Sequence, residues 1–355
     1  MKLAINLVLS LGMLALCLYF VWPNAQTLDQ LKHAWHALSW SEFAPYLAGY
    51  IGLLVVVHVC RAVRWNNLLA PIGVKLPIGP LLAISSVGFM AILALPARLG
   101  EFVRPGLLRQ RGISGTQALG TIAVERIVDG LIISLLVFGA CFSLRSPTSP
   151  PWMMKMAWIA LGVFTAAMVF LLLALRRPQR TVAFFLRLSL LPKIAPKIAT
   201  AIEDKLVSMI RGFEVLNDGR NLAVFVVWSV IYWFANGLGV WLLARGFHTI
   251  DPAFDLSLVA ALATMGIVAV GIMLPNSPGN FGQFQWFTLL GASITIIGAA
   301  DKNTAIYATA FAFANVHYFL QLLWYMGMGL LGLATPWVSF HDLALARKSG
   351  PAEAT

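Results

Sequence analysis

Long apolar stretches separated by short polar segments run along almost the whole chain. An α-helix needs about 20 apolar residues to cross a bilayer, and it satisfies its own peptide groups where lipid cannot. The pattern therefore predicts an all-α, polytopic membrane protein. The first stretch has the position of a signal peptide, but it is long and carries only Lys2, so we predict that it is the first span. The stretches cover roughly residues 3–22, 45–63, 80–95, 116–143, 156–175, 221–244, 256–274 and 305–334.

Two of these stretches end in the same pattern, Leu-Pro-x-x-x-Gly-x-Phe. It occurs at 95–102 as LPARLGEF and at 274–281 as LPNSPGNF. Proline removes a backbone donor and glycine relaxes the chain, so we predict a helix break at membrane depth in both places. Paired interruptions of this kind indicate a transporter binding site. The breaking residues are Pro96 and Gly100 in the first pattern, and Pro275, Pro278 and Gly279 in the second.

Two topologies fit the apolar stretches. In the first, all eight cross the membrane. In the second, six cross it, and the two interrupted stretches form re-entrant helical hairpins that enter from opposite faces as an inverted repeat. The second topology gathers more of the 25 Lys and Arg residues on the cytoplasmic face and leaves only Arg126 in mid-membrane. The positive-inside rule therefore favours it, with both termini in the cytoplasm.

The composition agrees with a membrane protein and narrows the function. Hydrophobic residues make up 59% of the 355 residues, charged residues 11%, and the mean hydropathy is +0.82. Membrane orientation and anionic lipid explain the net charge of +11, because no basic soluble domain is present to bind nucleic acid. The three cysteines are isolated and the histidines are not clustered, so we expect no disulfide framework, no metal site and no cofactor.

The domain organisation follows from the same pattern. We expect one integral membrane domain over residues 1–335, with halves at about 1–175 and 221–335. The joining segment 176–220 interleaves basic and apolar residues. This is typical of amphipathic helices on a membrane surface, although an ordinary cytoplasmic linker would carry the same charge. Residues 336–355 are expected to form a cytoplasmic tail, and we place the protein in the plasma (inner) membrane.

Three charged residues interrupt the apolar stretch 116–143, namely Glu125, Arg126 and Asp129. Each is costly in lipid unless it is paired or contacts water. A purely structural explanation is available, since Arg126 and Asp129 are three positions apart and can pair on the helix surface. We favour function, with Arg126 binding substrate and with Glu125 and Asp129 coupling its movement to protons or another ion.

Basic residues also surround the first helix break. Arg98, Glu101 and Arg104 are spaced three apart, and guanidinium groups there are suited to hold a lipid phosphate. Arg61, about one turn deeper than Arg64 at the end of the second stretch, is a further candidate for substrate binding. For Arg64 we predict ordinary anchoring at the membrane interface.

The second break carries neutral polar residues instead of charges, namely Asn276, Ser277, Asn280, Gln283 and Gln285. They suit hydrogen bonding to a headgroup or sugar, or alternatively to the broken backbone itself. Further polar and aromatic side chains could complete a lining, although hydrogen bonding between helices explains them equally well. These are Tyr232, Trp233, Asn236, Asn315, His317 and Gln321.

These motifs are similar to those of a known family. The order RAVRW, LPARLGEFVRPGLL, ERIVD and LPNSPGNFGQFQ spans almost the whole chain. It resembles the flippase-like integral membrane family named for the transmembrane region of lysylphosphatidylglycerol synthases. The resemblance implies translocation of a lipid or lipid-linked substrate, such as an anionic phospholipid or a polyprenyl- or hopanoid-type lipid. Because the chain ends at Thr355, we expect a stand-alone member without the synthetase domain.

The leading hypothesis is a flippase or scramblase that moves an anionic lipid or lipid-linked amphiphile between leaflets, with an arginine cavity that binds the headgroup phosphate. No GxxxxGK[ST] motif is present, so an ion gradient would drive the movement, or it would run downhill. We expect no enzymatic activity, since no catalytic motif such as HExxH occurs. The alternatives are an intramembrane lipid-modifying transferase and a membrane partner of a separate lipid-synthesis enzyme.

Overall fold

The computed structural model describes residues 2–109, 111–144, 151–176, 213–273 and 277–339, together with the single positions 180, 203, 206, 210 and 342. All regular elements in these parts are helices, which confirms the predicted fold class. Most of the predicted surface segment 176–220 and of the predicted tail 336–355 lies outside the described residues.

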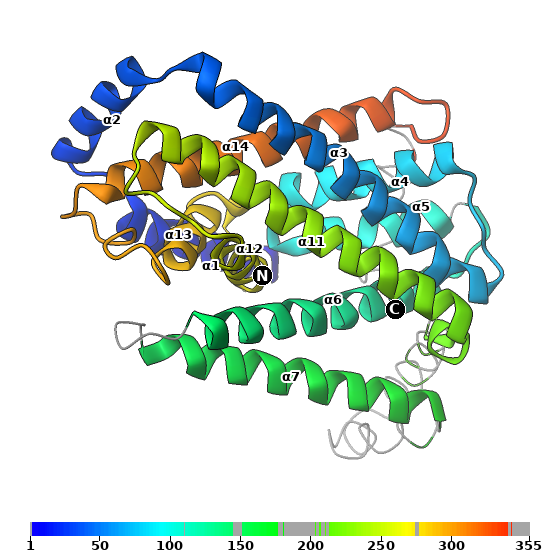
Figure 1. Cartoon of the computed structure of the whole chain (residues 1–355). Helices are drawn as coiled ribbons and strands as arrows, with labels where there is room; N and C mark the ends of the chain where they lie inside the picture. Colours follow the sequence, from blue (N-terminus) through cyan, green and yellow to red (C-terminus); the bar gives the residue numbers. More distant parts are fainter. Residues whose placement is uncertain are drawn as a thin grey trace.

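The elements follow the apolar stretches closely (Figure 1). The α-helices are α1 (Lys2–Val21), α2 (Ala25–Ala37), α3 (Trp40–Leu69), α4 (Ile78–Ala94), α5 (Val103–Arg109), α6 (Gly115–Ser143), α7 (Pro151–Arg176), α11 (Gly219–Ile250), α12 (Leu258–Gly271), α13 (Gln283–Ala292) and α14 (Ile306–Leu333). Short 3₁₀ turns lie between them at η1 (Ala70–Ile72), η2 (Pro96–Phe102), η3 (Glu214–Asn217) and η4 (Pro278–Asn280).

Three of the described helices, α3, α11 and α14, are each long and apolar enough to cross a membrane. The last part of α1 and the first part of α2 meet the same criterion together, but the chain bends by 69° between them. Shorter apolar helices occur at Ile78–Ala94, Ala157–Phe170 and Leu258–Gly271. The division into six full spans and two re-entrant hairpins stays a prediction.

Helices α3 and α11 pack against each other along most of their length and run in opposite directions (Figure 1). Gly246 of α11 lies against Phe43 of α3, and Gly239, which precedes Gly246 in α11, lies against Tyr50, which follows Phe43 in α3. Small residues at such positions let two membrane helices approach closely. The pair forms a rigid wall that presents arginines from α3 and aromatic residues from α11 to the interior.

The first LPxxxGxF pattern, and residues 277–281 of the second, each lie at the tip of an antiparallel helical hairpin. The first runs from α4 through η2 into α5, so that Gly100 lies against Ala91. The second runs from α12 through η4 into α13, so that Gly291 lies against Thr264. Figure 1 shows the two hairpins toward opposite ends of the long helices, and η2 contacts η4 between them.

The two tips share the effect of proline on the helix but differ in what their glycines do. A residue that precedes proline is pushed to extended backbone, and Leu95 before Pro96 (ψ 135°) and Ser277 before Pro278 (ψ 155°) both show it. The glycines differ. Gly279 adopts a φ of +63°, which L-residues disfavour, whereas a Cβ on Gly100 would overlap the Ala91 carbonyl.

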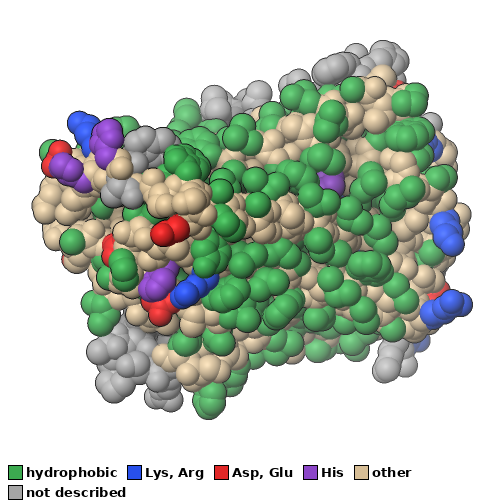
Figure 2. Space-filling view, turned by 45° about the horizontal axis from the view of Figure 1, so that its top comes forward, with side chains coloured by type: hydrophobic (Ala, Val, Ile, Leu, Met, Phe, Trp, Pro, Cys, Tyr) green, Lys and Arg blue, Asp and Glu red, His purple; other side chains and the backbone are tan. Residues whose placement is uncertain are grey.

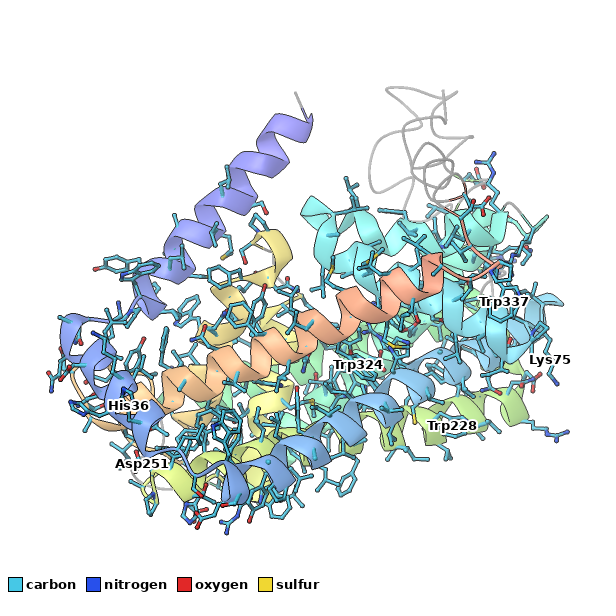
Figure 3. The ribbon with its side chains drawn as sticks, turned by 90° about the horizontal axis from the view of Figure 1, so that it is seen from above. His36, Lys75, Trp228, Asp251, Trp324 and Trp337 are labelled. Atoms are coloured by element: carbon cyan, nitrogen blue, oxygen red, sulfur yellow. The ribbon has the colours of Figure 1, made fainter. Side chains whose placement is uncertain are left out.

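The outer surface suits a lipid environment. Hydrophobic side chains cover much of the face in Figure 2, and most charged side chains gather toward its two ends. Trp158 of α7 and Leu323 of α14 are among the large apolar side chains that are more than half exposed. Figure 3 shows Lys75 at one end of the long helices and Asp251 at the opposite end. The two ends are therefore the polar faces of the molecule.

Candidate functional site

Four charged side chains form a closed network inside the helix bundle. Arg64 of α3 donates from Nη1 and Nη2 to the two carboxylate oxygens of Asp129, at 2.5 and 2.7 Å. Its Nη2 also donates to Glu125 Oε1 at 3.2 Å, and Arg104 of α5 donates to Glu125 Oε2 at 3.0 Å. All four side chains are buried. Two positive charges balance two negative charges, and the network ties α3 and α5 to α6.

Aromatic and hydroxyl groups from α3 and α11 support this network. The Trp233 indole N–H donates to Asp129 Oδ1 at 2.9 Å, and Ser229 accepts from Arg64 at 3.1 Å. The Arg64 guanidinium also lies 4.5 Å from the centroid of the Tyr232 ring. Buried charges are tolerated only when they are paired and hydrogen-bonded. Each of the four charges has a partner of opposite sign, whereas Arg64 Nε, Arg104 Nε and Arg104 Nη2 are buried without a hydrogen-bond partner.

The network corrects two interpretations made from local spacing. Arg64 does not anchor at the membrane interface, because it is fully buried and bonded to two carboxylates. Arg126 does not pair with Asp129, because Asp129 is occupied by Arg64 and Trp233. The acids that bind Arg64 are 61 and 65 positions away in the chain, so neighbouring residues gave no signal of the contact.

Arg126 faces the first hairpin tip instead. Its Nε lies 4.0 Å from Glu101 Oε1 on η2, and both side chains are about one quarter exposed. This distance is at the limit of an ion pair, and the partial exposure marks the loosest contact among the charges of the site. The Arg126–Glu101 contact therefore joins α6 to the tip only weakly.

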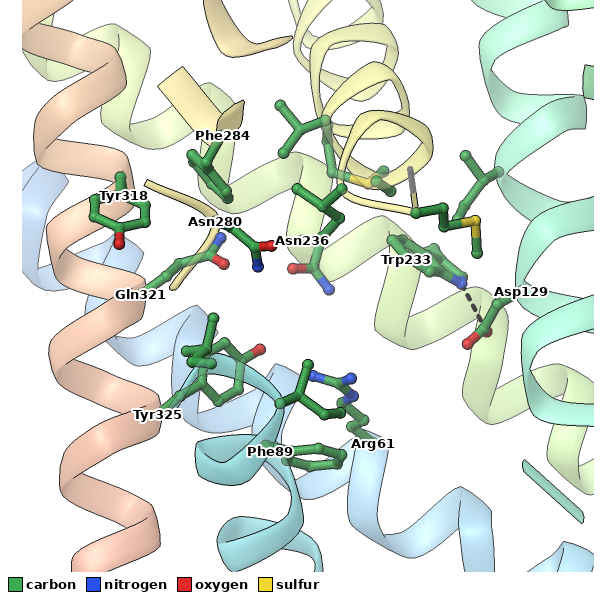
Figure 4. Close-up of a pocket in the computed structure, with 18 of the residues that line it drawn as sticks. Arg61, Phe89, Asp129, Trp233, Asn236, Asn280, Phe284, Tyr318, Gln321 and Tyr325 are labelled. Carbon is green, nitrogen blue, oxygen red and sulfur yellow. Dashed lines mark hydrogen bonds between the residues drawn. The ribbon is translucent and has the colours of Figure 1, made fainter. Parts of the chain in front are cut away.

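A cavity of about 160 Å³ lies where the two hairpin tips meet. On this measure a water molecule needs roughly 10–15 Å³, so a lipid headgroup with some water fits. Four of the predicted substrate-binding residues line it, namely Arg61, Glu101, Arg126 and Asn280. Asp129 also reaches its wall, and Figure 4 shows Arg61 pointing into the space from α3.

Arg61 stands apart from the other arginines of the cavity. Its guanidinium carbon lies 3.8 Å from the centroid of the Phe89 ring and 5.7 Å from that of Tyr325. Within the described part of the chain, no carboxylate lies within ion-pair distance of it, and its Nε is buried without a hydrogen-bond partner. Aromatic rings stabilise a cation but do not neutralise it. Arg61 therefore brings to the cavity a positive charge that has no direct ion-pair partner among the described residues.

The remaining predicted site residues lie elsewhere. Arg104 belongs to the buried network and does not line the cavity. Ser277 is fully buried, and its hydroxyl donates to Phe281 O at 2.7 Å, so it serves the turn. The side chains of Pro96 and Arg98 and the whole of 274–276, which includes Pro275 and Asn276, lie outside the described residues.

Side chains from two helices satisfy the broken backbone of the second tip. Gln283 accepts from Ser277 N at 3.0 Å and donates to Gly271 O at 2.9 Å, which bridges the two sides of the break. Gln285 accepts from Gly282 N at 2.8 Å, and the Tyr318 hydroxyl donates to Gly279 O at 2.9 Å. Gln283 and Gln285 thus hydrogen-bond to the broken backbone, which was the structural alternative to headgroup binding for the polar residues of the second break. Glutamine two and four residues after the last motif residue was the available sequence signal.

These features define an integral membrane protein with two helical hairpins and an interior cavity into which Arg61 points. The family model described as the lysylphosphatidylglycerol synthase TM region matches residues 4–324. The chain belongs to that family, as the motif resemblance predicted. Neither the curated proteins nor the solved structures contain a significant match to the chain.

Proposed function

We propose that the protein is a flippase or scramblase that moves an anionic lipid or lipid-linked amphiphile between the two leaflets. The headgroup phosphate would enter the cavity and contact Arg61 and Arg126, while the apolar tails stay in the surrounding lipid. Family membership and the helical membrane fold support a role in lipid metabolism or transport.

Arg61 is the observation that carries this proposal. An unpaired cation inside a membrane protein is costly, and it is retained where it serves a ligand or a transport pathway. A phosphate diester fits the planar guanidinium through two parallel hydrogen bonds and supplies the missing negative charge. An amphiphile with such a headgroup also suits a cavity whose remaining walls are mostly apolar and aromatic.

The Arg126–Glu101 contact offers a route from binding to movement. A phosphate that binds Arg126 competes with the carboxylate of Glu101 and thereby loosens the link between α6 and the first tip. Glu125 contacts two arginines, Asp129 binds Arg64 through both oxygens, and both side chains are almost fully buried. We therefore assign any proton coupling to Glu101, and we assign a mainly structural role to Glu125 and Asp129.

We also propose an orientation in the plasma (inner) membrane. The end of the molecule with Lys75 also holds Arg111, which donates to Trp337 O at 2.7 Å. The opposite end carries Asp251 and Asp255. Because basic residues favour the cytoplasm, the first end is the cytoplasmic one.

The test is a reconstitution that measures both the leaflet in which the lipid lies and any chemical change in the lipid. The pure protein is placed in liposomes with a trace of an anionic phospholipid, its leaflet distribution is followed, and the lipids are analysed by mass spectrometry. We expect the labelled lipid to change leaflet without chemical change. A modified lipid that stays in its leaflet would favour the transferase alternative. If the lipid neither moves nor changes, the protein is a partner of another enzyme.

A further inference from the structure

The wall of the cavity opposite Arg61 carries neutral amides. Asn236 of α11, Asn280 of η4 and Gln321 of α14 come from three separate elements and converge on the same space (Figure 4). An amide offers both donors and an acceptor, and so does a hydroxyl group, so the two are complementary. A polar wall of this kind suits a ligand with hydroxyl groups next to its phosphate.

Hydrogen bonds within their own helices orient two of these amides. Asn236 Nδ2 donates to Tyr232 O at 2.9 Å, and Gln321 Nε2 bonds to His317 Nε2 at 3.0 Å. Each of these bonds joins residues four apart, so the amides are held on the helix face that lines the cavity. A fixed amide can discriminate between headgroups, because it loses little freedom when a ligand binds.

The carboxylates of the cavity wall are occupied. Glu101 faces Arg126, whereas Asp129 binds Arg64 through both oxygens and accepts from the Trp233 indole. An ammonium group in this cavity would thus meet no available carboxylate from the described residues, and it would lie near the positive charge of Arg61. Like-charge contact of this kind is unfavourable at low dielectric.

We propose that the cavity selects a phosphate diester with an uncharged, hydroxylated headgroup and rejects a headgroup that carries a primary amine. The phosphate binds Arg61, and the hydroxyl groups bind Asn236, Asn280 and Gln321. This inference rests on the proposed function in taking the same cavity as the ligand site and Arg61 as the residue that binds the phosphate. The shared chemistry is the glycerol-like phosphodiester, which a membrane lipid or its soluble deacylated form could supply.

A binding measurement separates this inference from transport. The full chain in neutral detergent is titrated with phosphatidylglycerol, phosphatidylmethanol and phosphatidylethanolamine of identical acyl chains, and complexes are counted by native mass spectrometry. Phosphatidylmethanol keeps the charge but has no hydroxyl, whereas phosphatidylethanolamine adds the amine. We expect phosphatidylglycerol to bind about tenfold more tightly than phosphatidylmethanol, as one net hydrogen bond would provide, and phosphatidylethanolamine to bind most weakly. Deacylated glycerophosphoglycerol serves as the soluble competitor, and strong competition would assign the site to a soluble ligand of the same class.

Variants assign the preference to the amides. Asn236→Leu and Gln321→Met remove the amide and keep a side chain of similar branching, and each is expected to bring the ratio of phosphatidylglycerol to phosphatidylmethanol affinity toward one. Arg61→Gln is expected to weaken both anionic lipids equally. For the two amide variants, retained phosphatidylmethanol binding shows that the protein is folded, and for Arg61→Gln a wild-type thermal midpoint shows it. Equal wild-type affinity for phosphatidylglycerol and phosphatidylmethanol, or tightest binding of phosphatidylethanolamine, would overturn the inference. Lipid movement in liposomes without this headgroup preference would support the proposed function and overturn only the inference about the headgroup.

Discussion

Direct pairing separates the charged residues into two groups. Glu125 lies between Arg64 and Arg104. Each of these three side chains is at most 1% exposed, so a ligand cannot reach them. Arg126 and Glu101 are partly exposed, and the Arg61 guanidinium lies over the Phe89 ring. The first group stabilises the bundle, whereas the second lines the cavity.

The stabilising group is tested by Glu125→Gln. The amide cannot neutralise Arg64 and Arg104, so a buried positive charge is left without its partner. We expect a loss of about 3–5 kcal/mol in stability, measured as a lower thermal midpoint in detergent. Adding Arg104→Gln removes the surplus charge and should recover part of the loss.

Asp255→Asn is the matched control for that experiment. Asp255 pairs with Arg245 at 3.4 Å, but the Asp255 side chain is 65% exposed. An exposed ion pair contributes at most about 1 kcal/mol, so this variant should melt close to the wild type. Equal midpoints for Glu125→Gln and Asp255→Asn would show that the interior network does not hold the helices together.

At the scale of the elements, the two hairpin tips have similar sequences and different constructions. The second tip depends on side chains that bond to freed peptide groups, with Gln283 on both sides of the break. The first tip depends on close backbone packing, because Gly100 lies directly on the Ala91 carbonyl. Glycine is required there for space and not for its dihedral angles.

Gly100→Ala tests this packing. The added methyl group would overlap the Ala91 carbonyl, so η2 must move away from α4 and the cavity must change shape. Overpacking of this kind typically destabilises by about 1–3 kcal/mol. We expect a lower thermal midpoint together with a loss of lipid movement.

Gly52→Ala provides the comparison, since a Cβ at Gly52 of α3 meets nothing within 4 Å. It should be neutral or stabilising by up to about 1 kcal/mol, because alanine favours a helix over glycine. If both alanine variants behave alike, the close approach at Gly100 has no role in holding the tip.

The sequence predicts elements better than it predicts contacts. Apolar length locates the helices, and the proline before each turn locates both breaks, because these features act within a few residues. The pairing of Arg64 with Asp129 depends on how α3 packs on α6, and local spacing instead suggested Arg126 as the partner. Arg61 was predicted as a cavity residue from its depth in the span, whereas its aromatic support by Phe89 comes from α4 and had no local signal.

At the scale of the whole molecule, the long helices give the protein two polar ends. Lys75 belongs to the loop before α4 and Asn303 to the loop before α14, and both are exposed. The two hairpins lie toward opposite ends of the long helices, so these loops belong to opposite faces of the membrane in the proposed orientation.

Cysteine labelling tests this orientation. Cys17, Cys60 and Cys141 are all buried and can be replaced to give a cysteine-free background. Lys75→Cys is expected to react with an impermeant maleimide only after the membrane is opened, whereas Asn303→Cys should react in intact cells. Labelling of both positions in intact cells would contradict opposite faces for the two loops.

The central claim is that the positive charge of Arg61 binds the headgroup of the lipid that is moved. It is tested most directly by the initial rate of anionic lipid movement in liposomes for Arg61→Gln against Arg245→Gln, at matched thermal stability. A hydrogen bond to a charged group contributes roughly 1.5–3 kcal/mol, so Arg61→Gln should slow the movement at least about tenfold. Arg245→Gln changes only an exposed ion pair and should keep the wild-type rate. A wild-type rate for Arg61→Gln would contradict the claim.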